Sequence, residues 1–392
     1  MGATREAIRS YAGPPLFSWG FRPFFLFSAV WAAAAVPIWL AVFFHGGRIG
    51  GSEGLPWHIH EMLFGYVGGV IAGFLLTAVP NWTGRLPVTG MPLIGLVGLW
   101  LVGRASGFLP PSLWPLPALL DGAFLIVFAA VVWREILAAK NRRNLPVALM
   151  VSLLALANLF FHARGFWPDA VAVSERAAVA VITALIALIG GRIVPSFTQN
   201  WTLARGFAAR PAPFGPFDRA ALALAVTALA LWVADPLSTM SGASLGLAGI
   251  VHFIRLVRWR GWLAWRESMV WSLHIGYTFV PVGLLLLGGA ALAPSLFPFT
   301  AGLHALTAGA MGVMTLAVMT RASRGHTGRP RASDPATTGI YILAVLAAAA
   351  RIVAPFLADW TPLLLSASAL LWILAFSGFV LAYGPMLLRR SL

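Results

Sequence analysis

Histidines stand at the ends of long apolar segments in this sequence, where an imidazole could bind a metal ion. His58 and His60 precede an apolar run that reaches Pro80. An ionisable group inside a membrane-spanning segment is costly and indicates a functional site by default. His45 lies in a polar loop, where solvation is expected. The remaining histidines are therefore the candidate metal ligands: His58, His60, His162, His252, His274, His304 and His326.

The types of donor atom limit the choice of metal. The chain has no Cys, which excludes disulfides and thiolate sites. Neutral imidazole without thiolate suits haem iron, copper or zinc. Met311, Met314 and Met319, which follow His304, could add soft ligands for copper, although methionine is often only core filler. The carboxylates near the histidine-bearing span ends are few, which argues against a carboxylate-rich di-iron or magnesium site; they are Glu61 and Asp121.

The spacing of the first two histidines limits what they can do together. On a continuous helix, the side chains of His58 and His60 diverge by about 200°. We therefore expect one to face the bundle, while the other caps the helix, bonds to Glu61 or serves a second site. Further along, Gly65, Gly69 and Gly73 form two overlapping GxxxG steps. These favour close helix packing over a slot for a flat macrocycle.

Arginines within the apolar runs are candidate partners for haem propionates. Arg104 and Arg351 lie towards the outer ends of their spans, and Arg192 lies towards the inner end of its span. The same guanidinium groups could instead pair with Asp121 or with a helix C-terminus. Both interpretations stay open at this point.

Composition indicates which elements must position these residues. Of the 392 residues, 59% are hydrophobic and 10% are charged, whereas a soluble domain has about 25% charged residues. The sequence predicts an all-α polytopic membrane helix bundle, with residues 1–392 forming a single integral-membrane domain. About twelve transmembrane helices of about 20 residues each are expected, centred at about residues 33, 68, 100, 124, 155, 183, 226, 248, 278, 309, 346 and 374.

The net charge of +15 follows from membrane topology. Most Lys and Arg fall in alternate loops, so the positive-inside rule predicts an even number of spans with both termini in the cytoplasm. This distribution removes the reason to expect nucleic acid as a partner and leaves the lipid bilayer as the surroundings. The sequence identifies no protein partner.

A weak internal repeat relates two of the expected spans. Aligning His60 with His304 matches Gly65 with Gly309, Gly68 with Gly312 and Arg85 with Arg329 without a gap. This spacing predicts three four-helix units, at approximately residues 15–145, 146–262 and 263–392. We expect His60 and His304 to serve one outer metal site or equivalent positions in two neighbouring sites. His58 would support the helix start or bind a second ion. His274 would serve an inner site, together with His252 or His326.

Several motifs resemble the NnrS family. They are "WGFRPFFLFS", "WHIHEMLFGY…GFLLTAVPNWTGR", "GGRIVPSFTQNWT", "RWRGW", "LHIGY" and "HALTAGAMGVMTLAVMTRASRGHTGR", in the same order from about residue 17 to residue 331. That family comprises polytopic bacterial inner-membrane proteins that contain haem and copper and are linked to nitric oxide, in denitrification and in nitrosative-stress resistance. The resemblance implies haem b and copper as cofactors. The matching positions are His58, His60, His274, His304 and His326, with Arg22, Asn81, Arg192, Arg321 and Arg329 as polar partners. His162, His252 and Arg104 lie outside these motifs and rest on their position in the spans.

Three functional hypotheses differ in class. In the first, the protein binds, senses or detoxifies nitric oxide or a nitrosyl species at a metal centre; nitric oxide is small, neutral and soluble in lipid. In the second, it is a redox enzyme of the nitric oxide reductase type, although the spans offer few acidic residues for a proton relay. In the third, it transports copper, haem or an iron–nitrosyl species, because repeat-built bundles often transport. Whether the protein turns over a substrate stays open.

Overall fold

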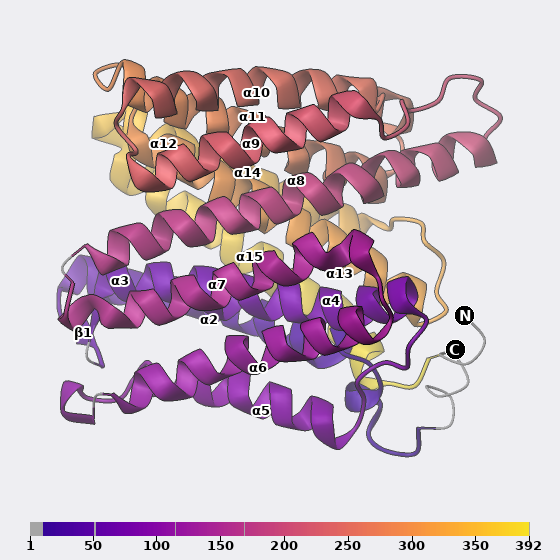
Figure 1. Ribbon diagram of the computed structural model, residues 1–392, viewed down its shortest axis with the longest axis horizontal. Helices are drawn as coiled ribbons and strands as arrows, with labels where there is room; N and C mark the ends of the chain where they lie inside the picture. The colour runs from indigo at the N-terminus through magenta and orange to yellow at the C-terminus, as the bar shows by residue number, and fades with distance from the viewer. Residues whose placement is uncertain (1–10, 51, 114, 168, 392) are drawn as a thin grey trace. The chain divides into compact units, whose positions relative to one another are not determined.

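The protein is described here from a computed structural model that covers residues 11–391 except 51, 114 and 168 (Figure 1). Helices dominate the described segments. The strands among them form one short antiparallel hairpin, β1 (Arg48–Ile49) with β2 (Ser52–Glu53). The outermost N-terminal residues, which the sequence places in the cytoplasm, lie outside the described part.

Contacts within the chain define two compact units. The first unit comprises the described part of Met1–Ala178, together with Ala322–Pro330 and Phe379–Leu392. Its chain order begins with η1 (Pro15–Ser18), α2 (Phe21–His45), the β-hairpin, α3 (Gly54–His60), η2 (Glu61–Val67), α4 (Gly68–Thr83), α5 (Met91–Ser106), η3 (Pro111–Leu113), α6 (Leu116–Ala138), η4 (Arg142–Asn144), α7 (Leu145–His162) and η5 (Ala163–Gly165).

The second unit comprises Val179–Arg321 and Arg331–Gly378. Three helices contribute residues to both units: α8 (Ala170–Ala204), α13 (Gly312–His326) and α15 (Thr361–Leu388). The helices that belong wholly to the second unit are α9 (Pro216–Ala234), α10 (Thr239–Arg258), η6 (Gly261–Ala264), α11 (Ser268–Leu292), α12 (Phe299–His304), η7 (Ala305–Met311), α14 (Pro335–Val353), η8 (Ala354–Phe356) and η9 (Ala358–Trp360).

The helices confirm the predicted fold class. Among the described residues, 11 helical stretches are long and apolar enough to cross a membrane, and α5 is a shorter apolar helix. Each of the twelve expected span centres falls inside one of these helices. The chain is therefore a multi-pass membrane protein. The predicted three-unit repeat and the single domain stay predictions.

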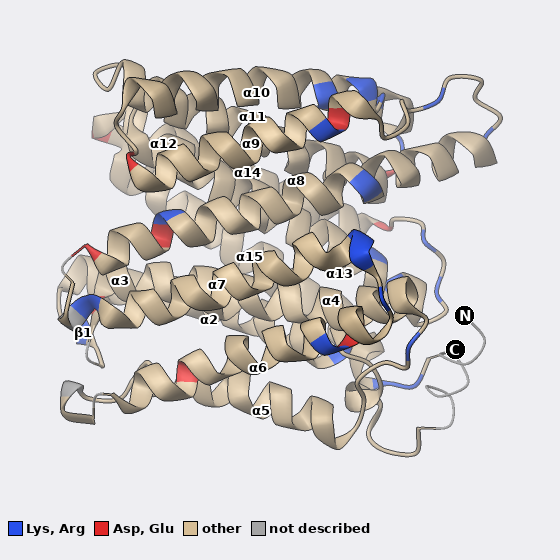
Figure 2. Ribbon diagram, viewed as in Figure 1, with Lys and Arg blue, Asp and Glu red and all other residues tan. Residues whose placement is uncertain are grey.

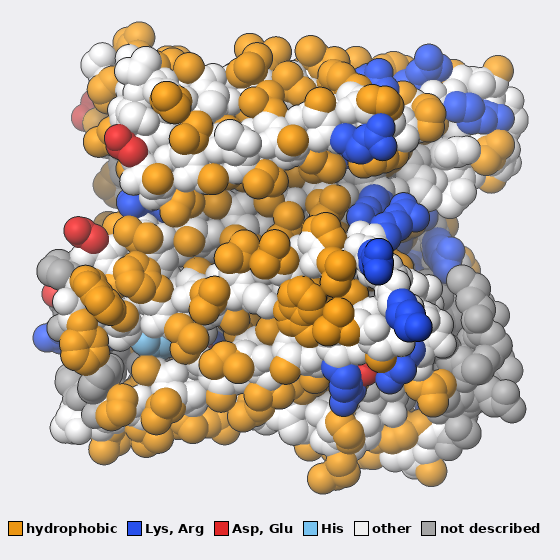
Figure 3. Space-filling model, viewed as in Figure 1, with side chains coloured by type: hydrophobic (Ala, Val, Ile, Leu, Met, Phe, Trp, Pro, Cys, Tyr) orange, Lys and Arg blue, Asp and Glu red, His pale blue; other side chains and the backbone are white. Residues whose placement is uncertain are grey.

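The distribution of charge on each unit fits this environment. Figure 2 shows Lys and Arg gathered near helix ends, for example at the connection from α6 to α7 and at the end of α10. Figure 3 shows hydrophobic side chains covering much of the helix surfaces between those ends. A lipid-facing helix must expose apolar side chains where the hydrocarbon is, so the apolar surfaces mark the bilayer-facing part of each unit.

Close packing of α4 against its neighbours explains its glycines. A Cβ atom at Gly73 would lie 2.9 Å from both Cβ of Phe24 and the ring of Phe25 on α2. At Gly69 it would lie 2.9 Å from Nε1 of Trp100 on α5. The GxxxG steps therefore bring helices together here, as the sequence favoured.

Two helices carry a π-helical segment directly after a histidine. Helix α3 ends at His60 and continues as the π-helix η2 and then α4; α12 ends at His304 and continues as the π-helix η7 and then α13. Beyond these helices the backbone adopts positive φ at Gly84 (73°) and Gly328 (81°). The sequence alignment of the two spans matches His60 with His304, and it also matches Gly84 with Gly328. π-helical segments are rare, and those that occur are often found at functional sites. Their presence at the same position in both helices supports the sequence alignment of the two spans.

Candidate metal centre

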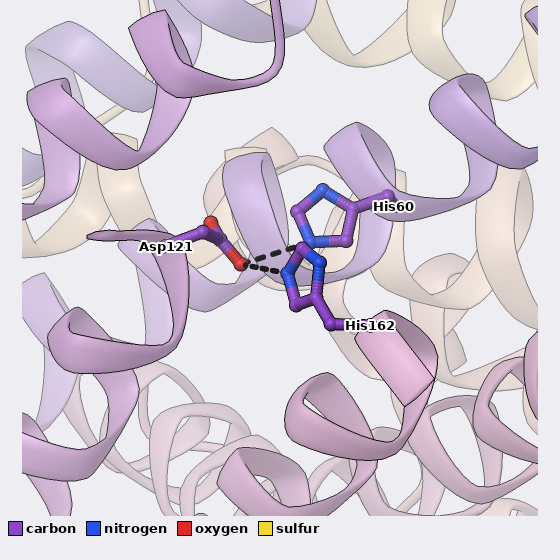
Figure 4. A group of neighbouring side chains, drawn as sticks. All are labelled: His60, Asp121 and His162. Carbon is purple, nitrogen blue, oxygen red and sulfur yellow. Dashed lines mark hydrogen bonds and ion pairs between the residues drawn. The ribbon is translucent and has the colours of Figure 1, made fainter. Parts of the chain in front are cut away.

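Three potential metal ligands meet in the first unit, each from a different helix (Figure 4). His60 is the last residue of α3, Asp121 lies in α6, and His162 is the last residue of α7. The Oδ2 atom of Asp121 lies 3.0 Å from Nε2 of His60 and 3.0 Å from Nε2 of His162. One ligand atom from each residue lies within 4.8 Å of the other two. No other His, Asp or Glu side chains in the described part form such a group.

Further polar side chains hold these ligands in place. His60 Nδ1 donates to Glu61 Oε1 at 2.9 Å, so the junction between α3 and the π-helix fixes both residues. Asn158 donates through Nδ2 to Asp121 Oδ2 at 2.8 Å, and its Oδ1 lies 3.0 Å from His60 Nε2. Trp31 Nε1 donates to Glu61 Oε2 at 2.9 Å. These bonds orient the His60 ring from both sides, as outer partners of metal ligands commonly do.

Arg104 supplies positive charge to this group. Its guanidinium donates one N–H to Glu61 and another to Asp121. Arg104, Glu61 and Asp121 are only 3%, 1% and 2% exposed, so water cannot replace these bonds. We call His60, Glu61, Arg104, Asp121, Asn158 and His162 the His60 cluster. Both ring nitrogens of His60 face acceptor oxygens, as in a protonated imidazole, so His60 and Arg104 together balance the two carboxylates.

A cavity of about 410 Å³ adjoins the His60 cluster. Its walls are mostly apolar and include Trp57, Leu109, Phe161 and Phe166, and Gly107 also lines it. Trp57 is 2% exposed, and its Nε1 has no hydrogen-bond partner among the described residues. In Figure 3, histidine colour shows at the surface between α6 and α7, at the end of the unit that holds the cavity.

The rim of the cavity carries an arginine. Arg164 in η5 donates from Nη2 to Ser52 Oγ of the β-hairpin at 2.7 Å, which ties two connections together. Partial burial lowers the pKa of Arg164, and nearby Arg48 acts in the same direction. The mouth of the cavity therefore carries positive charge, while the His60 cluster inside carries both carboxylates.

Two other predicted histidines lie in the first unit, in aromatic surroundings. His58 stacks on Trp39 of α2 with ring centroids 4.2 Å apart. His326, at the end of α13, packs against Trp19 at 4.5 Å and Phe21 at 5.6 Å. His58 thus faces a different neighbour from His60, and the separate roles of the two histidines stay a prediction.

Three predicted histidines lie in the second unit and are bonded to protein groups. His252 Nε2 donates to Ala221 O at 3.1 Å, and its Nδ1 lies 2.8 Å from the hydroxyl of Tyr277. His274 Nε2 lies 2.8 Å from Thr198 Oγ1.

His304 Nδ1 donates to Thr300 O at 2.7 Å. A site shared by His60 and His304, or an inner site shared by His274 and His326, would join the two units, so both stay predictions. His252 and His274 lie in the same unit, and their pairing is likewise a prediction.

The predicted cofactor-binding arginines occupy several settings. Arg104 belongs to the His60 cluster and pairs with Asp121, one of the two alternatives that the sequence left open. Arg22 donates to Leu387 O at 2.8 Å and to Arg389 O at 2.6 Å, and so caps the C-terminal end of α15.

The remaining predicted polar positions have local contacts. The Arg321 guanidinium lies 3.8 Å from the Phe197 ring centroid, Arg329 donates to Thr327 Oγ1 at 3.1 Å, and Asn81 donates to Thr77 O at 3.0 Å. Arg192 is half-buried on α8. A role of these residues in cofactor binding stays a prediction.

Sequence reasoning missed two members of the polar network, Asn158 and Trp31. Asn158 precedes His162 by four residues, which places both side chains on one face of α7. A polar pair at that spacing in an otherwise apolar helix could have indicated that Asn158 belongs to the same site as His162. Trp31 carried no comparable signal, because aromatic residues are common throughout the chain.

Comparison with known proteins identifies the chain's relatives at the level of the family. The family model described as NnrS protein matches residues 15–391. This match covers nearly the whole chain and confirms the resemblance seen in the sequence motifs. None of the curated proteins matches the chain.

Proposed function

We propose, on the premise that the chain belongs to the NnrS family, that it is a haem- and copper-binding protein of the bacterial inner membrane. In this proposal it binds, senses or detoxifies nitric oxide or a nitrosyl product, in denitrification or nitrosative-stress resistance, and both termini are cytoplasmic. Family membership and the multiple apolar helices support the setting. The chemistry rests on the His60 cluster.

The single observation that carries the metal assignment is the convergence of His60, Asp121 and His162. Two imidazole nitrogens and one carboxylate oxygen suit copper, and they are also the donor set of non-haem iron(II) centres. The three residues come from three helices, so small shifts of each side chain could close the set around one ion. The donor set therefore fits copper, and metal analysis separates it from iron or zinc.

Charge favours a copper ion in this buried place. If a metal ion takes the place of the proton on His60 Nε2, both imidazoles are neutral and the other charges of the His60 cluster sum to −1; burying such an unbalanced charge is expensive. A monovalent cation such as copper(I) makes the cluster neutral, whereas a divalent cation leaves an excess of +1. Arg104 therefore helps to select the charge of the ion.

The cavity beside the His60 cluster suits a small neutral ligand. Nitric oxide partitions into lipid, and the mostly apolar walls of the cavity require no polar channel. Copper held by His60, Asp121 and His162 would supply a centre that binds nitric oxide. Trp57 and Gly107 line the same cavity, and Trp57 Nε1 has no hydrogen-bond partner among the described residues.

We assign copper rather than haem to the His60 cluster, because one donor atom from each of His60, Asp121 and His162 lies within 4.8 Å of the other two and the set is compact enough for a single ion. In our proposal haem b binds histidines outside the His60 cluster, with His274, His304 and His326 as the motif positions. The family resemblance supports this part of the proposal.

Elemental analysis of the purified protein, and electron paramagnetic resonance after oxidation of the bound copper to copper(II), test the copper assignment. Wild type is compared with His60→Ala and His162→Ala, and with His45→Ala, whose exposed side chain belongs to no cluster, as the matched control. We expect copper to be lost from the two cluster variants and kept in the control. Retention of the full copper content in both cluster variants would reject the site.

Nitric oxide binding is tested separately by visible spectroscopy of the same samples. A nitric-oxide-induced shift of a haem Soret band in the wild type supports the haem part of the proposal. A colourless protein that holds only zinc would contradict both cofactors.

One observation favours a second candidate function, transport. The two helices aligned by the sequence repeat each become π-helical after His60 and after His304, and irregular helices at corresponding repeat positions can mark the binding site of a transporter. Reconstituted vesicles would show copper accumulation driven by an ion gradient if this is the function. Equal copper content in vesicles with and without the protein would remove it.

A further inference from the structure

A surface groove at the end of α10 is separate from the His60 cluster. It encloses about 490 Å³ in the second unit. Its apolar wall is formed by Phe253, Ile254 and Val257 on α10, and its polar end by Arg258, Arg260 and Trp262.

The polar end of the groove has a fixed geometry. The Arg258 guanidinium lies over the Phe217 ring at 4.7 Å from its centroid. Ala212 N donates to Arg258 O at 3.0 Å, which holds the preceding connection against the end of the helix. Arg260 has φ = 54°, in the left-handed region that a residue with a side chain rarely adopts. Such conformations persist where the surroundings enforce them, and they cluster at functional sites.

The electrostatics of the groove favour an anion. Its lining includes two arginines and no Asp or Glu among the described residues. Ala209, in the connection between α8 and α9, also lines the groove. The next residue, Arg210, has a buried Nη1 without a hydrogen-bond partner among the described residues. Figure 3 shows Lys and Arg gathered at this end of α9 and α10.

The apolar wall continues along a helix face that lipid would cover. Phe253, Ile254 and Val257 are 45%, 49% and 49% exposed, and Ile250 and Leu247, one and two turns earlier, are 53% exposed each. Trp262, at the polar end, is 59% exposed. Arginine and tryptophan beside the end of an apolar helix are typical of the membrane–water interface. The groove therefore leads from hydrocarbon depth to headgroup depth.

We propose that this groove binds one anionic phospholipid, with its phosphate between Arg258 and Arg260 and an acyl chain along Phe253, Ile254 and Val257. A free anion would use the arginines but not the apolar wall. A zwitterionic headgroup would bring a cation to a place that already carries two guanidinium groups. The charge and the continuous apolar face together select an anionic lipid.

Native mass spectrometry of the full-length protein tests this proposal. Delipidated protein in detergent micelles is titrated with phosphatidylglycerol and, in parallel, with phosphatidylcholine. We expect the wild type to retain phosphatidylglycerol preferentially. Arg258→Gln/Arg260→Gln should bind it roughly 10- to 30-fold more weakly, since each basic residue near an anionic surface contributes about a fivefold factor.

Two further variants separate the groove from general surface charge. Arg142→Gln/Arg143→Gln removes two exposed arginines from η4, outside the groove, and should leave lipid binding unchanged. Val257→Trp keeps both groove arginines but fills the space beside the apolar wall, and it should also weaken the binding of phosphatidylglycerol. Helix content and elution volume confirm that each variant is folded.

Several outcomes would overturn the assignment. Equal retention of the two lipids by the wild type would remove the headgroup preference. An equal loss in the η4 control would show that binding follows net charge alone. Inorganic phosphate that displaces phosphatidylglycerol at equal concentration, together with normal binding by Val257→Trp, would reduce the site to a simple anion site.

Discussion

Replacing Arg104 by glutamine leaves Glu61 and Asp121 without the guanidinium that bridges them. All three side chains are at most 3% exposed, so solvent cannot take over the role of the lost cation. Removing one partner of a buried ion pair costs about 3–5 kcal/mol, because the remaining charge stays buried and uncompensated. We therefore expect Arg104→Gln to lower the free energy of unfolding by about that amount.

Unfolding in mixed detergent micelles, followed by circular dichroism, measures this loss. Arg134→Gln is the matched control, because Arg134 also pairs with a glutamate, Glu135, at 2.7 Å, but its side chain is 64% exposed. An exposed pair contributes about 0–1 kcal/mol, so the control should change little. The variant Glu61→Gln/Arg104→Gln/Asp121→Asn removes all three charges, with the same Arg104→Gln change in volume as the single variant, and should regain most of the lost stability.

The relative stabilities of these variants decide whether charge balance holds the His60 cluster together. Equal losses in Arg104→Gln and Arg134→Gln would refute the reasoning, because burial would then not matter. A neutral triple variant as unstable as the single variant would refute it as well, since packing rather than charge would then be responsible.

Three further predictions use other contacts. Gly73→Ala should lower the free energy of unfolding by about 1–3 kcal/mol, because its Cβ meets α2 closely; Gly95→Ala, with open space around it, should not. Gly107→Ala places its Cβ 3.4 Å from both Trp57 Nε1 and Glu61 Oε1, which are ordinary contacts. We expect normal copper by elemental analysis but weaker nitric oxide binding by spectroscopy, because the methyl group narrows the cavity; unchanged affinity would contradict the role of the cavity. Arg22→Gln leaves carbonyls at the end of α15 without their donor, and should destabilise the protein by about 1–3 kcal/mol in the same unfolding assay.

Much of the fold was predictable because the bilayer imposes a simple rule on sequence. Every backbone polar group must be satisfied inside hydrocarbon, so long apolar runs become helices. This rule placed every expected span centre within an observed helix. The alignment of His60 with His304 in the internal repeat was also visible in the sequence. The structure adds that a π-helical segment follows each of the two histidines.

The sequence by itself therefore determined the helices, the family and the pool of candidate histidines. Only the tertiary structure decided which of them meet. His60 joins Asp121, 61 residues away, and Asn158, 98 residues away. The physical reason is that many of these helices are apolar on all sides, so the sequence does not show which face of each helix turns inwards. Close packing of whole helices sets that rotation, and it brings His60 to Asp121 while His58 stacks on Trp39.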